Sequence, residues 1–254
     1  MGGGGAPGRR GRADVDEHPA RRGVGVVVPY DFALDREMWR WVPDAVDLFV
    51  TRTRNLPLYA DVAMARRIST DNAVRVGTRD VLAVDPDVVL YLCTSGSFVR
   101  GLAGERRIRA VMRAAGAPAA VTTSGALLDA LAHLGAREIA VASPYVPEVA
   151  ARLDAYLHEA GIRVLTHRRL GLNEHIWQVS RRTVRDLVLA ADHEAAPAVF
   201  VSCTNVPTFD LIAELEDLLG KPVLTANQVS LWAALHQIGA VPAGTGQRLF
   251  APRH

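Results

Sequence analysis

Several residue types are scarce in this 254-residue sequence, and each scarcity argues against a class of protein. Two cysteines are too few for a disulfide scaffold or a structural zinc site. Lys221 is the single lysine, which argues against a lysine Schiff base and a pyridoxal phosphate enzyme. No apolar run reaches the length of a membrane span, and no apolar region of a secretory signal follows residues 1–5. We therefore expect a cytoplasmic protein with free thiols.

An excess of one charge is absent as well. The chain has 29 Lys and Arg against 27 Asp and Glu, a formal net charge of +2. This balance indicates neither a nucleic-acid partner nor attraction to a membrane surface. A hydrophobic content of 49% with 22% charged residues is typical of a globular protein long enough for one large domain or two small ones.

The order of apolar and polar segments predicts a layered α/β fold. Residues 1–22 are rich in Gly, Arg, Asp and Pro, and we interpret them as a disordered leader. From Gly23 onward, short apolar runs alternate with helical patterns, as in parallel sheets covered by helices. We expect strands over 23–28, 47–51, 88–94, 119–123, 138–142, 163–166, 198–202 and 222–225. Helices are expected over 70–85, 105–115, 125–135, 147–160, 180–191, 209–219 and 229–238.

Two motifs recur about half a chain apart. A strand breaks at Pro29-Tyr30 and again at Pro144-Tyr145, and Cys-Thr follows a strand at Cys93 and at Cys203. The repeat predicts two pseudo-symmetric halves. We assign the first half to residues 23–120 plus about 216–254 and the second to 121–215, so that the closing strand and helix return to the first half.

The two cysteines are the strongest candidates for chemistry. Each ends an apolar run, Val88–Leu92 before Cys93 and Val199–Ser202 before Cys203. A thiol between a strand and a helix meets free N–H groups and the positive end of the helix dipole, so we expect both thiol pKa values to fall below about 8.5. The same N–H groups could hold a carboxylate, together with the polar side chains of Thr94, Ser95, Ser97, Thr204 and Asn205.

The two cysteines could also have a purely structural role. A single cysteine in an apolar strand most often fills space in the core. Two cysteines in matched Cys-Thr settings favour chemistry, either proton transfer or addition beside a carboxylate, with no metal or organic cofactor. A structural disulfide between them is a further alternative, although the expected compartment disfavours it.

Four motifs in order resemble those of the maleate cis-trans isomerases: the early strand followed by Pro29, then Cys93–Ser97, Ala142–Tyr145 and Ser202–Asn205. These isomerases belong with arylmalonate decarboxylase to the aspartate/glutamate racemase superfamily, and the likeness covers about residues 23–240. It implies two pseudo-symmetric Rossmann-like (flavodoxin-like) halves with parallel sheets and the active site in the cleft between them. It also implies a small carboxylate substrate and no cofactor, and it allows a homodimer.

The resemblance also implies roles for individual residues. Cys93 matches the nucleophilic cysteine that adds to the substrate double bond, and Cys203 matches the cysteine that donates and recovers a proton at the neighbouring carbon. Tyr145 matches a tyrosine whose hydroxyl holds a substrate carboxylate. The matching carboxylate cradle consists of Thr94, Ser95, Thr204 and Asn205.

Two positions depart from the isomerase pattern. The isomerases typically read Pro-Ser-Ser-Asn after the first strand, whereas this chain reads Pro29–Phe32. His175 stands where they carry an asparagine after the sixth strand. Phe32 is therefore a candidate contact that would select a bulkier or less polar acid, and His175 is a candidate neutral donor to the substrate. The alternatives are core packing for Phe32 and an exposed loop position for His175. Asp31 is interpreted first as a turn residue.

The leading hypothesis is a cofactor-independent isomerase of a small carboxylic acid with a two-cysteine mechanism, most like maleate cis-trans isomerase. An amino-acid or hydantoin racemase is the nearest rival, because it too uses two thiols. An arylmalonate-type decarboxylase is a weaker alternative, since that enzyme keeps only the second cysteine. A non-catalytic protein that binds small acids is the alternative from another class. The enzyme hypotheses predict fast thiol alkylation near neutral pH, and the binding protein predicts slow alkylation.

Overall fold

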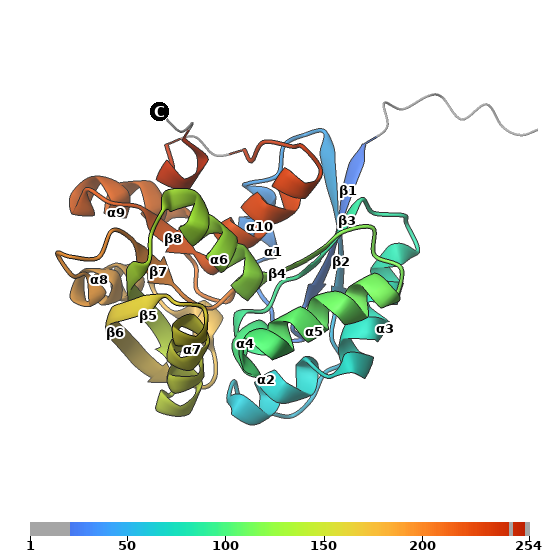
Figure 1. The fold of residues 1–254 in the computed structure, drawn as a ribbon, viewed down its shortest axis with the longest axis horizontal. Coiled ribbons are helices and arrows are strands. Elements are labelled where there is room, and N and C mark those ends of the chain that lie inside the picture. Colours follow the sequence, from blue (N-terminus) through green and yellow to red (C-terminus); the bar gives the residue numbers. More distant parts are fainter. Residues whose placement is uncertain (1–20, 244–245, 252–254) are drawn as a thin grey trace, which may run out of the picture.

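The computed structural model describes residues 21–243 and 246–251. This part of the chain forms two four-stranded parallel sheets with helices on their faces (Figure 1). Of the leader predicted over residues 1–22, residues 1–20 lie outside the described part of the chain. The predicted α/β class with two parallel sheets is confirmed.

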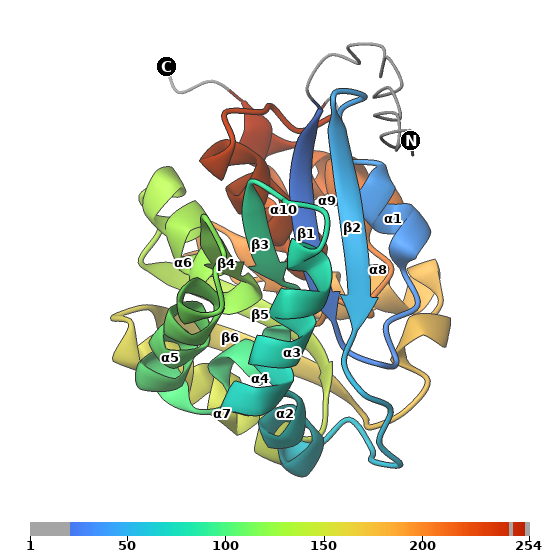
Figure 2. The same cartoon turned by 90° about the vertical axis from the view of Figure 1, so that its right-hand side faces the viewer.

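The first sheet has the strand order β2-β1-β3-β4. Beyond Arg22, the residues of its central strand β1 are all buried, as are those of β3, as expected for parallel strands covered on both faces. Figure 2 shows this sheet with α3 in front of it. Its elements are β1 (Arg22–Val28), α1 (Asp35–Trp39), β2 (Val46–Arg52), α2 (Val62–Ile68), α3 (Asp71–Leu82), β3 (Val88–Tyr91), α4 (Thr94–Phe98), α5 (Gly101–Ala114) and β4 (Ala120–Thr122).

The second sheet repeats this topology with the order β6-β5-β7-β8. Its elements are α6 (Thr123–Leu134), β5 (Glu138–Tyr145), α7 (Pro147–Glu159), β6 (Arg163–Leu172), η1 (Ile176–Gln178), α8 (Arg181–Ala191), β7 (Val199–Val201), η2 (Phe209–Leu211), α9 (Ile212–Leu219), β8 (Val223–Thr225), α10 (Ala226–Gln237) and η3 (Arg248–Phe250). The third strand in chain order of each half, β3 or β7, ends just before a cysteine. The repeated order therefore places the two thiols at equivalent ends of two sheets.

Helices α6 and α10 join the two halves. Each follows the last strand of a sheet and begins at a threonine that caps it: Thr122 accepts the Gly125 N–H, and Thr225 accepts the Gln228 N–H. The two helices pack against each other between the sheets (Figure 1), where the Ser230 hydroxyl donates to Thr123 at 3.0 Å. One hydrophobic cluster consequently runs through both halves.

The structure corrects several local expectations. The strand β8, which we expected in the first half, pairs with β7 in the second sheet, because the short connection through α9 returns the chain beside β7. Strand β5 runs on to Tyr145 instead of breaking at Ser143, and β6 extends to Leu172 into the expected loop. The short helix α2 was not expected, and the helix start expected after Cys93 is α4, which has only five residues. The boundaries proposed for the two halves stay a prediction.

Within residues 21–243 and 246–251, no helix has the length and apolar character needed to cross a membrane. The same residues contain no cluster of three His, Cys, Asp or Glu side chains with the arrangement of a metal site.

Candidate active site

Cys93 lies two residues after β3 and starts the next helix. Its backbone is extended, with a φ of −150°, and its sulfur accepts the N–H of Gly96 at 3.3 Å, so the thiol itself caps α4. A Cβ on Gly96 would stand 2.5 Å from the hydroxyl of Tyr91 and 3.1 Å from the sulfur. Glycine is therefore required there for the helix to approach the thiol so closely.

Cys203 occupies the equivalent place after β7 but has another geometry. Its φ is +88°, a left-handed conformation that a non-glycine residue rarely adopts and that costs about 1–3 kcal/mol. Its carbonyl accepts the N–H of Val206 at 3.2 Å, which closes a turn instead of a helix. Such strain is retained where the surrounding structure holds it, and it is common at functional sites.

Both thiols open into one small cavity at the junction of the two halves. They are free, so the disulfide alternative is wrong for this structure. The cavity measures about 30 Å³, the space of a single water molecule, so binding of a substrate requires it to widen. The predicted site residues that line it are Cys93, Thr94, Ser95, Tyr145, Cys203, Thr204 and Asn205. Sequence reasoning did not propose the remaining lining residues as contacts: Pro29, Asp31, Ala60, Met64 and Ile176.

The expected fall of the thiol pKa values is wrong. Burial raises the pKa of Cys93 to about 12, because the loss of solvent outweighs the hydrogen bonds from the Gly96 N–H and from Ser95. Burial likewise raises the pKa of Cys203 to about 12, against the opposing effect of the Asn205 N–H. Both sulfurs are therefore protonated in the unliganded protein at neutral pH. The fast alkylation that the enzyme hypotheses predict stays a prediction.

Asp31 projects a carboxylate into the same cavity. Its Oδ1 is buried and has no hydrogen-bond partner among the described residues. Burial raises the pKa of this carboxyl, and its charge raises the pKa of Cys93 and of Cys203. Sequence analysis interpreted Asp31 first as a turn residue, because nothing in the motif shows that its side chain turns inward.

Asn205 fixes the loop that carries Asp31. The amide Nδ2 of Asn205 donates to the Asp31 carbonyl at 3.2 Å, and its Oδ1 accepts the Ala33 N–H at 3.0 Å. A residue two positions after the second thiol thus ties together the loops of the two halves. The side-chain amide of Asn205 is already engaged in this positioning.

A buried polar network supports the loop of Cys203 from the first half. The carboxylate of Glu37 accepts the N–H and the hydroxyl of Thr208, at 2.9 and 3.0 Å, and the amide of Asn227 at 3.1 Å. The same Asn227 amide donates to the Thr204 carbonyl at 3.0 Å. Burial raises the pKa of Glu37 in spite of these bonds. Sequence analysis missed this network, whose members lie far apart in the chain.

Tyr145 stands at the end of β5, beside both thiols. Its hydroxyl accepts a hydrogen bond from Ser202 at 3.2 Å, and its ring meets the edge of Phe98 with centroids 5.9 Å apart. Burial raises the pKa of Tyr145 well above its usual value. The phenol therefore keeps its proton and can donate it to a substrate oxygen.

Phe32 and His175, the two candidate contacts that depart from the isomerase pattern, lie outside the thiol cavity. Phe32 is 3% exposed and belongs to the hydrophobic core. The His175 side chain is 59% exposed, and it lines a neighbouring depression of about 410 Å³ with Tyr30, Tyr59 and Trp177. Asp31 and Ala60 border both spaces. The structure thus places Phe32 in the core and His175 in the exposed loop.

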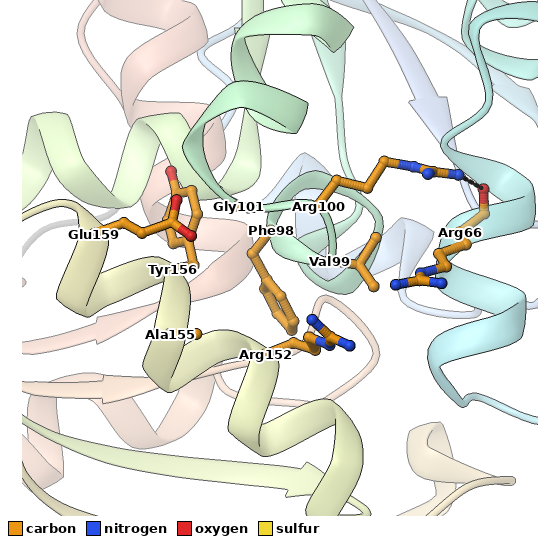
Figure 3. Close-up of a pocket in the computed structure, with 9 residues that line it drawn as sticks. All are labelled: Arg66, Phe98, Val99, Arg100, Gly101, Arg152, Ala155, Tyr156 and Glu159. Atoms are coloured by element: carbon orange, nitrogen blue, oxygen red, sulfur yellow. Dashed lines mark hydrogen bonds between the residues drawn. The ribbon is translucent and has the colours of Figure 1, made fainter.

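A separate depression of about 330 Å³ lies between α7 and the start of α5 (Figure 3). Arg66, Arg100 and Arg152 line it, and the carboxylate of Glu159 accepts the Leu102 N–H at 2.9 Å. The predicted site residues line the thiol cavity or lie elsewhere, so this depression is not the candidate active site.

The comparisons with known proteins agree with this geometry. A family model described as arylmalonate decarboxylase matches residues 68–250. Arylmalonate decarboxylase of Bordetella bronchiseptica is 36% identical over 157 residues, 60% of this chain and 65% of that protein. Maleate isomerase of Geobacillus stearothermophilus is 27% identical over 161 residues, 60% of this chain and 64% of that protein. The matched part therefore spans slightly less than two thirds of each of these two relatives.

Solved structures extend the likeness over the described fold. A liganded, doubly substituted variant of arylmalonate decarboxylase superposes with a TM-score of 0.83 at 27% identity, covering 90% of this chain and 98% of the other. The maleate isomerase Iso of Pseudomonas putida superposes with a TM-score of 0.80 at 21% identity, over 90% and 98%, and this likeness concerns the fold. The resemblance inferred from the motifs is thereby confirmed, and because the family model matches more than half of the sequence, the chain belongs to the arylmalonate decarboxylase family.

Proposed function

We propose that the protein is an isomerase that acts on a small carboxylic acid by a two-cysteine mechanism, most like maleate cis-trans isomerase. The observation that carries the proposal is the meeting of both thiols in one cavity that also holds the Tyr145 hydroxyl. The relatives are maleate isomerases and an arylmalonate decarboxylase, enzymes whose names specify a carboxylic acid as the substrate.

In the proposed reaction, the thiolate of Cys93 adds to one alkene carbon, and the electron pair of the double bond moves to the neighbouring carbon. That carbon takes the proton of the Cys203 thiol, so a single bond remains and can rotate. Cys203 then removes the same proton, the double bond re-forms in the trans geometry, and the carbon–sulfur bond breaks to release Cys93. No net oxidation or reduction occurs, and no co-reactant is consumed.

The polar wall of the cavity would hold one carboxylate while the rest of the substrate rotates. Thr94 and Ser95 lie in the first turn of α4, and Tyr145 faces them from the second half. Donors on opposite sides of one carboxylate fix its position, which is the condition for rotation at the other end of the molecule.

An arylmalonate-type decarboxylase is the second candidate, favoured by the family match and by the 36% identical relative. Decarboxylation needs a proton donor for the carbon that loses carbon dioxide, and Cys203 could serve. It needs no nucleophile that adds to a double bond, so Cys93 would be dispensable. A racemase, the other rival, would use both thiols on the two faces of one carbon.

Single substitutions of the two cysteines separate these reactions. Maleate, 2-aryl malonates and amino acids are incubated with the protein in deuterated water and followed by NMR. Isomerisation changes the alkene signals, decarboxylation loses a carbon, and racemisation introduces deuterium at Cα. For the isomerase, Cys93→Ser and Cys203→Ser each abolish turnover while the circular dichroism spectrum is kept. Full activity of Cys93→Ser on an aryl malonate would instead establish the decarboxylase.

A further inference from the structure

The two-thiol mechanism leaves one proton without a destination. Cys93 must lose its proton before the sulfur can attack, because the thiolate is the nucleophile. With a thiol pKa of about 12, only about one molecule in 10⁵ is ionised at pH 7. Cys93 is only 3% exposed, so bulk water has little access to carry this proton away. A group in the cavity wall must therefore accept it.

Asp31 is the one carboxylate among the described residues that line this cavity. The other ionisable groups beside Cys93 are Cys203, whose proton the reaction needs, and Tyr145 and Tyr91, which are neutral phenols and hence poor bases. His175 lies in the neighbouring depression and does not line the cavity. Asp31 is thus the candidate acceptor.

The surroundings of Asp31 differ from those of a structural acid. The buried carboxylate of Glu37 accepts three hydrogen bonds, as buried acids in proteins usually do. Oδ1 of Asp31 is also buried, but it accepts none from the described residues. An unpaired buried acceptor is costly, and it persists because Asn205 holds the Asp31 backbone in place. A buried, unpaired carboxylate oxygen in the cavity of the two thiols is well placed to accept a proton from one of them.

We infer that Asp31 is the base that accepts the proton of the Cys93 thiol, an inference that rests on the proposed two-thiol function. The S–H bond of Cys93 breaks, an O–H bond forms on Asp31, and the electron pair left on sulfur forms the bond to carbon. Cys203 supplies the proton of the neighbouring carbon. When the carbon–sulfur bond breaks again, the proton on Asp31 returns to Cys93, so one cycle leaves every group as it began.

The raised pKa of Asp31 agrees with this role. Burial brings the pKa of the carboxyl closer to that of the thiol, so transfer between them is less unfavourable than to an exposed aspartate. A second role for the same carboxylate, simple repulsion of negative charge, makes the opposite prediction. If Asp31 only repels, its removal lowers the thiol pKa and makes Cys93 more reactive.

The test measures the rate at which iodoacetamide alkylates Cys93 between pH 5 and 11. The background is Cys203→Ser, in which Cys93 is the single cysteine of the chain. With Asp31 present, the rate is independent of pH from the pKa of the carboxyl up to alkaline pH. In Asp31→Asn, the rate at pH 7 falls about 100-fold and rises tenfold per pH unit. A rate at pH 7 that is unchanged or higher in Asp31→Asn would overturn the inference.

Two further variants exclude a general effect of the substitution. In Asp31→Gly, added formate restores alkylation at pH 7, because it supplies a carboxylate in the space of the lost side chain. Asp129→Asn also removes a carboxyl whose pKa burial raises, but from a different depression, and it leaves the alkylation rate unchanged. Thermal melts confirm that each variant is folded.

The alkylation readout does not depend on the identity of the substrate. If Asp31→Asn slows alkylation but no carboxylic acid is turned over, Asp31 is the base and the proposed isomerisation is wrong. If maleate is isomerised and Asp31→Asn alkylates as fast as the parent, the isomerase stands and the assignment of Asp31 is wrong.

Discussion

The two thiols occupy equivalent places in the two halves, yet different forces hold them. Cys93 is fixed locally, because its sulfur caps the helix that starts at the next residue. Cys203 is fixed from a distance, since its strained turn is held by Glu37 and Asn227, which belong to α1 and α10. A pseudo-symmetric fold therefore fixes where a thiol stands without fixing how it is supported.

Because of this difference, substitutions that affect Cys93 and substitutions that affect Cys203 should lie in different parts of the chain. A change beside Cys93 acts through one helical turn, within four residues of the sulfur. A change that disturbs Cys203 can lie more than 160 residues away, as Glu37 does. Long-range support makes the second thiol sensitive to the packing of the two halves and the first one largely independent of it.

Gly96→Ala should have the largest effect on the Cys93 side. The new Cβ would stand 2.5 Å from the Tyr91 hydroxyl, so α4 must shift away from the thiol and its cap is weakened. We expect a loss of about 1–3 kcal/mol in the free energy of unfolding, measured by urea denaturation. Turnover should fall at least about 100-fold, because a displacement near 1 Å at the nucleophile has that effect. Turnover within twofold of the parent would show that α4 tolerates the shift.

Glu37→Ala probes the Cys203 side. The Thr208 N–H and the Asn227 amide lose their buried acceptor, which should cost about 1–3 kcal/mol in the free energy of unfolding. Proton transfer at Cys203 should be impaired while the alkylation rate of Cys93 stays as in the parent. The exposed Glu214→Ala, which loses an ion pair to Arg185, is the matched control and should change stability by less than about 0.5 kcal/mol. Equal loss at both thiols would contradict independent support.

The same contrast explains how far the sequence could predict the site. The alternation of apolar runs and helical patterns predicted the start of each of the eight strands of the described chain to within one residue, whereas the end of β6 was missed by six. Each thiol follows the end of a parallel strand, and the repeat of the Cys-Thr motif predicted that both face one pocket. Tyr145 was assigned to the same site only through the resemblance to the isomerases.

Depth of burial and contacts between distant residues could not be predicted. The motif around Cys93 indicates a helix start and hence a low thiol pKa, whereas burial reverses the direction. Asp31 follows Pro29-Tyr30 and carries the signature of a turn residue. Only the fold shows that it lines the cavity of the two thiols and that its buried Oδ1 has no partner among the described residues. The network of Glu37 has no local signature in the sequence, because helix propensity and periodicity carry no information about contacts between residues far apart in the chain.

The stability of the protein should fall at alkaline pH because of both thiols. Their pKa is about 12 in the folded protein against 9.0 for an unperturbed cysteine, so the native state keeps protons that the unfolded chain loses. The contribution is fully present below pH 9 and is lost progressively as pH rises toward 12. Urea denaturation of the parent and of the double Cys→Ser variant at pH 8, 9 and 10 should give curves that diverge with rising pH. Parallel curves would mean that the thiols ionise equally in both states.

His175→Ala should have the smallest effect, and it tests whether the neighbouring depression takes part in binding. The side chain is 59% exposed and outside the thiol cavity, so the free energy of unfolding should change by less than about 0.5 kcal/mol. A small substrate held at the thiols does not reach His175, and kcat/KM should stay within about twofold of the parent. A rise in KM confined to aryl substrates, with maleate unaffected, would instead show that a bulky substituent extends past Asp31 and Ala60 into the depression lined by Tyr59 and Trp177.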